Sequence, residues 1–545
     1  MSAPGLINLD GSPMRSEAST AFRAGDRLSQ ELASYNPMLL SPDAALWGIR
    51  DDVVARGTDL NRNNGYAAGA RQSQIDNVIG ANWMLCVEPL WHSLGLGDMP
   101  DEDKDAFCEY VEEAFDEWAH DPGCWIDAGR RCGFIGLLRQ GFGSWWDAGE
   151  HLSVAHWLDD RVGLGRASMA TAIQMISPDR LSQPNGTMDS QKMRGGIELG
   201  PYGEPNYYNI RKAHPYDPWL GAEVYQWERL PREDEFGRPV VIHGFVVEGD
   251  GMTRGVSPMA SVTEAFRLQD VFERGAAKAS LINTLIAATI ETQSGIDDDM
   301  LKAAFSPPLP RGAAEIARAE REGVSRPQIP GRPFMLGDRT IVPKLPVGTT
   351  LKMTTPQNPN GAAYQQFTDA VLRRLAAGLG TSFEELSRDY SRTNYSSARA
   401  SLLGAWKAIT GRSAFIERTL ANPIYALWFE EAVDRGRIVL PSMRKNGGTP
   451  SFYERRSAWL RNAWIGPGRG HVDPVKERQA YQIGRDTYTD SSQSANAEQG
   501  RDWRRTARQI SRENRLYKRL GLPIATTASL LSVDGTSKDE RSAIQ

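Results

Sequence analysis

Six side chains in the second half of the chain suit contact with a polyanion. They fall within one short stretch and are Arg388, Tyr390, Arg392, Asn394, Tyr395 and Arg399. Guanidinium groups form paired hydrogen bonds with phosphate oxygens, and tyrosine offers a stiff surface with a polar tip. The segment therefore predicts contact with something polar or anionic. A solvated connection between two helices is the alternative, because most loops are only surface.

Helices on both sides must hold this stretch. Upstream, apolar residues recur at helical spacing from Tyr364 to Leu375. Gly378 and Gly380 are predicted to end that helix, because glycine tolerates the left-handed conformation of a C-cap. The chain must therefore turn just before the arginine-bearing segment.

Capping residues predict two further helices after the turn. Thr381 and Ser382 are each followed three residues later by glutamate, which offers two registers of a capping box for one short helical turn. Ser396 or Ser397 then caps a further helix that reaches about Asn422. Its predicted buried face comprises Leu402, Trp406, Ile409, Ile416 and Leu420.

Three ordered blocks in this region resemble the portal proteins of lambda-type tailed phages. They are Leu372–Gly380 (LRRLAAGLG), Ser382–Leu386 (SFEEL) and Asn394–Ala400 (NYSSARA). Arg254–Pro258 resembles the family's segment before its first long helix, and Trp464–Glu477 resembles its C-terminal signature. The likeness covers roughly residues 40 to 520, so it is a resemblance of the whole chain.

The resemblance implies an α+β portal fold assembled as a ring, with a β-rich wing, a long-helix stem, a small clip and a helical crown. The implied ranges are 1–40 for an N-terminal arm, 41–257 for the wing, 258–293 for the first stem helix, 294–346 for the clip, 360–381 for the second stem helix, 382–397 for a tunnel loop, 398–483 for a long helix and the return to the wing, and 484–545 for the crown and tail.

Local patterns within these ranges predict both helices and strands. A helical pattern begins at Pro42, an amphipathic helix is expected over Asp101–Trp118, and a further helix over about Ala128–Trp146. Short β-prone runs then alternate with Gly, Pro and Asn turns, which favours a β-sandwich or barrel-like unit. The runs are His151–Leu158, Thr171–Ile176, Tyr207–Lys212, Val224–Glu228 and Val240–Val247.

A long helix is expected from Pro258 to about Thr292. Small and apolar residues recur along it at helical spacing, so it suits lateral packing, against a core by pattern alone or against adjacent subunits by resemblance. The packing set is Val262, Leu268, Phe272, Gly275, Ala279 and Ile282. The proline-rich stretch 294–346 matches the place of the clip, since proline at that density excludes long helices and central strands.

The last predicted helix, Arg501–Arg519, is strongly basic. Arg504, Arg508 and Arg512 form a candidate DNA-facing surface of the crown, and a solvated face is the alternative. The chain as a whole carries a net charge of -5, unlike tight and static nucleic-acid binders, whose affinity comes from many phosphate contacts. We therefore expect DNA contact to be local or weak, which suits a conduit through which DNA must slide.

Composition and motifs exclude several other classes. A chain of 545 residues with 40% hydrophobic content can bury large cores. We expect no signal peptide, no membrane span and no cofactor, and we expect the four cysteines to be reduced thiols. A phosphate-binding GxxxxGK[ST] loop is absent from the sequence, which weighs against an ATP-driven motor.

Metal binding has little support in the sequence. The acidic residues Asp101, Asp103, Asp105 and Glu112 follow an EF-hand-like spacing, but Ala106 stands where that loop needs glycine. An acidic first turn of a helix explains them equally well. His151 and His156 are five residues apart, a spacing that neither a helix nor a strand places on one face, so we interpret both as structural.

Together these features predict a non-enzymatic portal subunit. By resemblance it forms a dodecameric ring at one capsid vertex and meets double-stranded DNA, the terminase packaging motor, the major capsid or scaffold protein, and a head-completion or tail adaptor protein. It would reside in the virion after assembly in the host cytoplasm. A DNA-packaging nuclease or ATPase subunit, or a tail structural protein, is the alternative.

Overall fold

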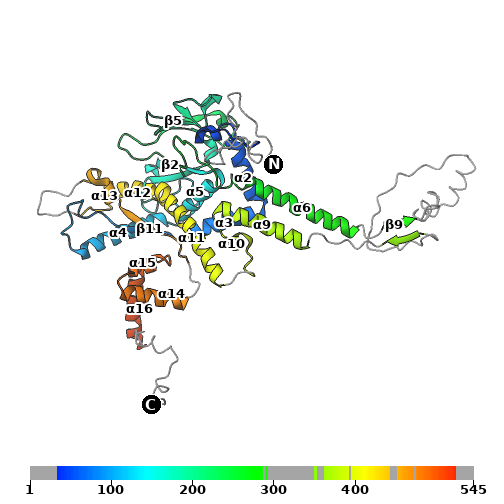
Figure 1. Ribbon diagram of the computed structural model, residues 1–545. Coiled ribbons are helices and arrows are strands. Elements are labelled where there is room, and N and C mark those ends of the chain that lie inside the picture. Colours follow the sequence, from blue (N-terminus) through cyan, green and yellow to red (C-terminus); the bar gives the residue numbers. More distant parts are fainter. Residues whose placement is uncertain are drawn as a thin grey trace, which may run out of the picture. The chain divides into compact units, whose positions relative to one another are not determined.

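The computed structural model describes residues 34–285, 289–292, 349–352, 361–391, 395–441, 451–469 and 474–522 (Figure 1). The chain divides into two compact units. The first comprises Met1–Ala55, Met84–Ser257 and Phe415–Trp464, and the second comprises Arg56–Trp83, Pro258–Ala414 and Ile465–Gln545. The predicted clip, the N-terminal arm and the C-terminal tail lie mainly outside the described residues.

Two antiparallel sheets, one of three strands and one of four, form most of the β-part of the first unit. In the three-stranded sheet, β2 (Glu150–Trp157) lies between β3 (Thr171–Ile176) and β8 (Val241–Phe245). The four-stranded sheet has the order β4 (Met193–Arg194), β5 (Ile197–Leu199), β6 (Pro205–Arg211) and β7 (Trp227–Pro231). Short 3-10 turns connect them at Asp159–Arg161, Pro178–Arg180, Pro184–Gly186 and Gly221–Tyr225.

One hydrophobic cluster joins the two sheets. Leu152 and Val154 contribute from β2, and the remaining members of this buried set come from both sheets and the connections: Ile176, Leu181, Ile197, Tyr208, Ile210 and Val241. Successive side chains of a strand point to opposite faces, so Leu152 and Val154, two residues apart on β2, both enter this cluster. The short strands predicted here form open sheets that share this cluster. The strand predicted over Val224–Glu228 is wrong in its first half, where the chain forms a 3-10 turn.

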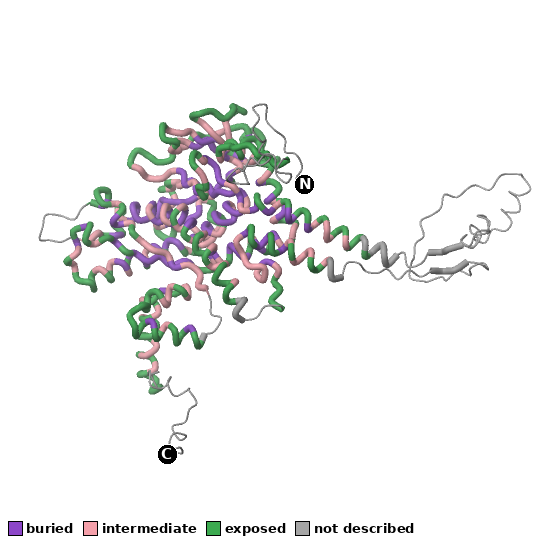
Figure 2. The backbone as a smooth tube through the Cα atoms, viewed as in Figure 1, coloured by how far each residue is buried: buried purple, intermediate pink, exposed green. Residues whose placement is uncertain are grey.

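Aromatic side chains fill the helical part of the first unit. Its helices are α1 (Pro42–Leu46), α4 (Asp101–Ala119), α5 (Phe134–Ala148), α12 (Asn422–Asp434) and α13 (Arg456–Trp459), and β1 (Met84–Val87) pairs with β11 (Asn462–Ile465). Phe115 of α4 lies 5.1 Å from Trp428 of α12 between ring centroids, and Phe134 lies 5.2 Å from Trp464. The helix predicted over Asp101–Trp118 is confirmed, whereas α5 begins later than the predicted Ala128. Buried residues follow β2, α5 and α12 in Figure 2.

The acidic and histidine residues weighed for metal binding have structural positions. Asp101 and Asp103 lie in the first turn of α4, while the carboxylate of Glu112 is buried and accepts a hydrogen bond from the Val87 amide at 2.9 Å. An EF-hand loop is therefore not formed. His151 and His156 point to opposite faces of β2: one meets Thr419 and the other meets Gln174. Within the described ranges, no group of three or more candidate ligands could hold a metal ion.

The second unit is mainly helical. It contains α3 (Gly65–Val78), α6 (Thr263–Leu285), α9 (Gly361–Leu379), α10 (Phe383–Ser387), α14 (Pro474–Asp486), α15 (Ser492–Ala497) and α16 (Trp503–Leu520), while α2 (Arg50–Asn63) begins in the first unit. The first stem helix was predicted to run from Pro258 to Thr292. It is shorter, because residues 258–262 form a turn and β9 (Thr289–Thr292) pairs with β10 (Thr349–Lys352). The β-branched residues of β9 favour a strand.

The predicted helix from Ser396 to Asn422 is confirmed in outline. It is α11 (Tyr395–Ile416), which continues through a π-helical turn at Glu417–Ala421 into α12. Pro423 lacks an amide hydrogen and clashes with the carbonyl of a regular preceding turn, so a widened turn before it relieves the clash. Of the predicted buried face, Ile409, Ile416 and Leu420 are buried, but Leu402 is 41% exposed.

None of the helices in the described part of the chain combines the length and the apolar character needed to cross a bilayer. All four cysteines are free thiols.

Candidate nucleic-acid interface

The turn before the arginine-bearing segment rests on two glycines with different roles. Gly380 adopts the left-handed conformation at φ 64° directly after α9, as predicted for a C-cap. Gly378 instead lies inside α9, and a Cβ there would overlap the side chain of Val262. Gly378 therefore permits close approach of the chain segment that leads into α6 and does not end the helix.

Ser382 starts α10. Its Oγ accepts a hydrogen bond from the Glu385 amide at 3.1 Å, so the Ser382 register of the predicted capping box is the one used. The Glu385 carboxylate does not return to the cap. It accepts hydrogen bonds from Thr381 Oγ1 at 2.6 Å, from Ser73 Oγ at 2.5 Å and from Asn77 Nδ2. These bonds fasten α10 onto α3.

Arg412 of α11 supports the same turn from another side. Its guanidinium donates to the Leu379 carbonyl at 2.6 Å, at the C-terminus of α9, and to Gln74 Oε1 of α3. Burial lowers the pKa of Arg412 to about 10, and the charge of Glu385 opposes this shift. The side chain therefore stays charged at neutral pH, where it complements the negative end of the α9 dipole.

The exposed residues 388–391 follow directly after α10. Arg388 ends α10 in the left-handed conformation, at φ 57°, and its side chain is exposed. The Ser391 amide donates to Asp389 Oδ1 at 2.9 Å, which forms a local turn, and the ring of Tyr390 is exposed. Two exposed groups, one cationic and one aromatic, thus project from a hydrogen-bonded turn.

Four further residues were predicted to belong to this loop. Arg392 and Asn394 lie outside the described residues. Tyr395 is the first residue of α11, so the predicted loop ends before it, and neither Ser396 nor Ser397 is the cap. Arg399 is exposed on the first turns of α11. The described residues of the predicted loop over 382–397 form α10, an exposed stretch at 388–391 and the start of α11.

Charge in this segment is balanced. Between residues 384 and 399 the three arginines Arg388, Arg392 and Arg399 are matched by three acids, Glu384, Glu385 and Asp389. A phosphate backbone would meet single cations here and no continuous basic surface, which limits both affinity and salt dependence.

The predicted crown surface lies on α16. Asp502 caps this helix by accepting from the Arg505 amide at 2.6 Å. Arg504, Arg508 and Arg512 are spaced four residues apart, so they share one face, and Arg512 is exposed.

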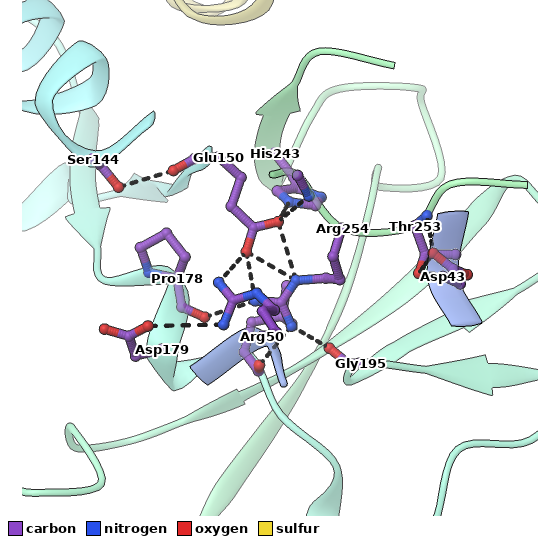
Figure 3. A network of polar contacts seen from close by, with 12 residues as sticks. Asp43, Arg50, Ser144, Glu150, Pro178, Asp179, Gly195, His243, Thr253 and Arg254 are labelled. Atoms are coloured by element: carbon purple, nitrogen blue, oxygen red, sulfur yellow. Dashed lines mark hydrogen bonds and ion pairs between the residues drawn. The ribbon is translucent and has the colours of Figure 1, made fainter. Parts of the chain in front are cut away.

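A second polar cluster lies in the first unit, around Glu150 (Figure 3). This fully buried carboxylate accepts from Arg254 at 2.5 Å, from Arg50 at 2.7 Å and from His243 Nε2 at 3.0 Å. Burial alone would raise the pKa of Glu150, but the two guanidinium groups and the hydrogen bond from His243 hold that pKa well below its ordinary value. The carboxylate is therefore ionised and fully paired.

Arg254 also organises the backbone around it. Its remaining N–H groups donate to the carbonyls of Leu181 at 2.9 Å, Gly195 at 2.7 Å and Pro178 at 3.0 Å. The neighbouring Thr253 amide donates to Asp43 of α1 at 2.8 Å. The segment around Thr253 and Arg254, which leads toward α6, is thus fixed to α1, α2 and the sheets of its own unit.

These supporting residues were not predicted from the sequence. The position of Arg412 could have been predicted from its spacing. It lies three residues after Ile409 and four before Ile416, on the face predicted to be buried. A lone arginine on such a face must be paired. Glu150 and Arg254 are separated by 104 positions, and no local pattern connects them.

Comparison with known proteins assigns the chain. Residues 29–412 match the family described as "Phage portal protein, lambda family". The chain belongs to this family. It is 34% identical over 489 residues to the portal protein of Escherichia phage N15, covering 88% of this chain and 87% of that protein. It is also 34% identical over 484 residues to portal protein B of Escherichia phage lambda, covering 87% and 86%.

A more distant relative is the probable portal protein of Halomonas phage phiHAP-1, 22% identical over 491 residues and covering 88% of this portal chain and 83% of that protein. Among solved structures, a chain from the neck of an empty GTA particle, computed with C6 symmetry, aligns with a TM-score of 0.43 and 12% identity over 82% of this chain and 93% of its own. The predictions of the family and of a portal role are confirmed.

Proposed function

We propose that copies of this portal chain close into a ring, a dodecamer, whose central channel passes double-stranded DNA into and out of a capsid. The observation that carries the proposal is family membership over most of the chain. The geometry of α6 also supports it. One face of this helix packs against other residues of the same chain, whereas another face leaves apolar side chains exposed.

The satisfied face of α6 packs within its own unit. Phe272 lies 4.1 Å from Phe367 of α9 between ring centroids and stacks on Tyr364 at 5.7 Å. Val262, in the turn directly before α6, is buried against Gly378. Two of the six predicted stem-packing residues are therefore used within one copy of the chain.

The other face of α6 carries an apolar stripe. Leu268 is 51% exposed and Val271 is 53% exposed, and a Cβ placed on Gly275 would meet nothing within 4 Å. These three residues share one side of the helix, where a neighbouring helix could approach closely. The side chains of Ala279 and Ile282 lie outside the described residues. This stripe supports lateral packing between stem helices of adjacent copies.

The balanced charge of the segment around Arg388 supports a role in loose, sliding contact with DNA. Each phosphate neutralised by a cation adds to affinity and to the barrier against movement. The exposed face of α16 around Arg512 is the proposed DNA-facing surface of the crown. We further propose contacts with the terminase motor, the major capsid or scaffold protein and a tail adaptor, a location in the virion after assembly in the host cytoplasm, and a role without enzymatic activity.

Electron microscopy and native mass measurement of the purified chain test the ring. Closed rings with a central hole are expected, with a mass that is a whole multiple of 60.3 kDa. Monomers or open fibres at all concentrations would contradict the proposal. Leu268→Lys should weaken assembly, whereas Arg267→Lys, at the adjacent exposed position, should not.

Shortening of the segment from Asp389 to Asn394 tests the DNA role separately. Rings are expected to assemble, because the contacts of Glu385 and Arg412 that hold the turn between α9 and α10 are unchanged. DNA packaging or retention should fall. If assembly itself is lost, the segment is structural and the proposed DNA contact is wrong.

A further inference from the structure

The loop that joins β6 to β7 exposes large aromatic side chains. In this loop, residues 212–226, Trp219 is 90% exposed, Tyr216 is 88% exposed and Tyr225 is 76% exposed. Isolated apolar residues are common on surfaces, but several aromatic rings gathered in one loop are typical of an interaction site. We call residues 212–226 the aromatic loop.

The aromatic loop is ordered by its own contacts. The Trp219 amide donates to Asp217 Oδ1 at 2.9 Å, and the Tyr216 amide bonds to His214 Nδ1 at 3.2 Å. Ala213 and Val224 are buried and anchor both ends of the loop. A loop held in place before binding loses little entropy when a partner covers its rings.

A cavity of about 490 Å³ lies elsewhere in the same unit. Its lining includes Tyr208, His243, Phe245, Met252, Arg232 and Arg418. The volume falls in the range of roughly 300–1,000 Å³ that is typical of pockets for drug-sized ligands. A tryptophan side chain is smaller than such ligands and would fit.

The aromatic loop and the cavity lie at opposite ends of one sheet. The loop follows Arg211, which pairs with Trp227, whereas the cavity borders Pro205 and Arg232, next to the pair of Tyr207 and Pro231. β6 spans seven residues, so the two features are roughly 20 Å apart at about 3.3 Å per residue. They cannot meet within one copy of the chain.

Their charges are complementary. The aromatic loop carries two acids, Asp217 and an exposed Glu223, against one lysine, the exposed Lys212 at its start. The cavity carries Arg418, which forms no hydrogen bond or ion pair with the described residues, and Arg232, which pairs with Glu233 at 3.2 Å. One cation at the cavity therefore remains unmatched and could meet a carboxylate of the loop.

We propose that the aromatic loop of one copy docks into this cavity on the next copy, with Trp219 as the anchor. The proposal rests on the proposed ring, because only a second copy supplies both features in the required order. Because the aromatic loop and the cavity lie at opposite ends of one sheet, their contact between copies is head-to-tail, and head-to-tail contacts can close into rings.

Cysteine cross-linking tests the docking directly. Trp219→Cys and Met252→Cys in one chain cannot bridge internally, because a disulfide requires Cα atoms within about 7 Å. On oxidation we expect a ladder of covalent oligomers up to the full ring. A mixture of the two single variants should give covalent dimers and nothing larger, since each chain then carries one new thiol. The wild-type chain, with its four native cysteines, is the control for background.

Truncation gives an independent measure. Trp219→Ala should raise the concentration for half-assembly at least tenfold, as expected for a buried aromatic anchor, while Leu164→Ala, a fully exposed residue of the same unit, should leave it unchanged. Rings that form normally from Trp219→Ala and show no ladder from the double-cysteine chain overturn the docking but leave the proposed ring intact. Normal rings from Trp219→Ala that fail to enter capsids would mean that the loop binds another protein, which also overturns the proposal. A wild-type chain that forms no ring contradicts the proposed function itself.

Discussion

Two carboxylates, one in each unit, organise junctions of the chain by different chemistry. Glu150 is fully buried and is paired with two guanidinium groups and a histidine. Glu385 is partly buried and accepts hydrogen bonds from two hydroxyls and an amide. Opposite charge stabilises the carboxylate that is fully excluded from water, whereas neutral donors hold the carboxylate that stays partly exposed.

The difference determines what each junction can do. At Glu150 both arginines are engaged within the cluster: Arg50 pairs with carboxylates and Arg254 also holds three backbone carbonyls, so that region is a support. At Glu385 the supporting bonds come from neutral groups and from Arg412, and Arg388 stays exposed for a partner. Four substitutions test this contrast, from the largest expected effect to the smallest.

Arg254→Met should have the largest effect. It removes the principal partner of a buried carboxylate and leaves three carbonyl acceptors without their donor, so we expect a loss of about 3–5 kcal/mol in the free energy of unfolding of the first unit. Urea denaturation followed by tryptophan fluorescence measures this loss. Arg229→Met is the matched control, because Arg229 pairs with Glu198 at 2.8 Å on the surface of the same unit. Equal effects of the two substitutions would contradict the assignment of Glu150 as a buried support.

The residue after Glu150 predicts a dependence on pH. His151 is fully buried, and burial lowers its pKa to about 3. Thr419 Oγ1 donates its hydrogen to the Phe415 carbonyl, so His151 Nε2 must be the donor to Thr419, and the ring is neutral. The unfolded chain takes up a proton near pH 6.5 and the folded chain does not, so acid favours unfolding.

Between pH 7 and pH 5 this difference should cost about 2 kcal/mol of stability. Denaturation at both pH values checks the figure. His151→Gln keeps a donor for Thr419 but cannot be protonated, so its stability should change less over the same interval. Glu150 should not alter this result. Its pKa is depressed in the folded chain, so its contribution to the free energy of unfolding is lost only below about pH 4.5. An identical pH slope in both chains would show that His151 is not the group that titrates.

Local patterns in the sequence predicted much of the scaffold. The helices α4 and α16 and the strands β2 and β3 follow their expected residues closely, because their apolar periodicity is regular and their ends carry clear signals. The end of α6 was predicted too late because apolar residues continue into β9, where β-branched side chains favour a strand.

The supports of both junctions were not predicted, because they depend on contacts between distant segments. Glu150 meets Arg254 and Arg50 across about a hundred positions in each direction, and Glu385 meets α3 across more than three hundred. The exposure of Leu402 likewise depends on which elements cover α11. The loop position of Arg388 and Tyr390 was predictable because polar residue types after a helix stop are visible in the sequence itself, and both side chains are exposed.

Glu385→Ala should have an intermediate effect. It leaves Ser73, Asn77 and Thr381 without a shared acceptor, so we expect a loss of about 1–2 kcal/mol in the free energy of unfolding and faster hydrogen exchange over residues 381–391. Glu384→Ala is the control, since Glu384 accepts a single hydrogen bond from the residues that the structure describes, from Ser401 at 2.9 Å. If both variants exchange alike, Glu385 is not what holds α10 on α3.

Arg388→Gly should have the smallest effect on stability and the clearest effect on DNA. The backbone there is left-handed, which glycine adopts without strain, so the free energy of unfolding should change by less than about 0.5 kcal/mol. Loss of one phosphate contact should flatten the dependence of DNA affinity on salt by about one unit of slope for each contact removed. Tyr390→Phe, which keeps the ring and the charge, should leave that slope unchanged. An equal slope for the Arg388→Gly ring and the wild-type ring would mean that Arg388 contacts no phosphate. The proposed contrast between Arg254, which is paired within the protein, and Arg388, which is exposed for a partner, would then be wrong.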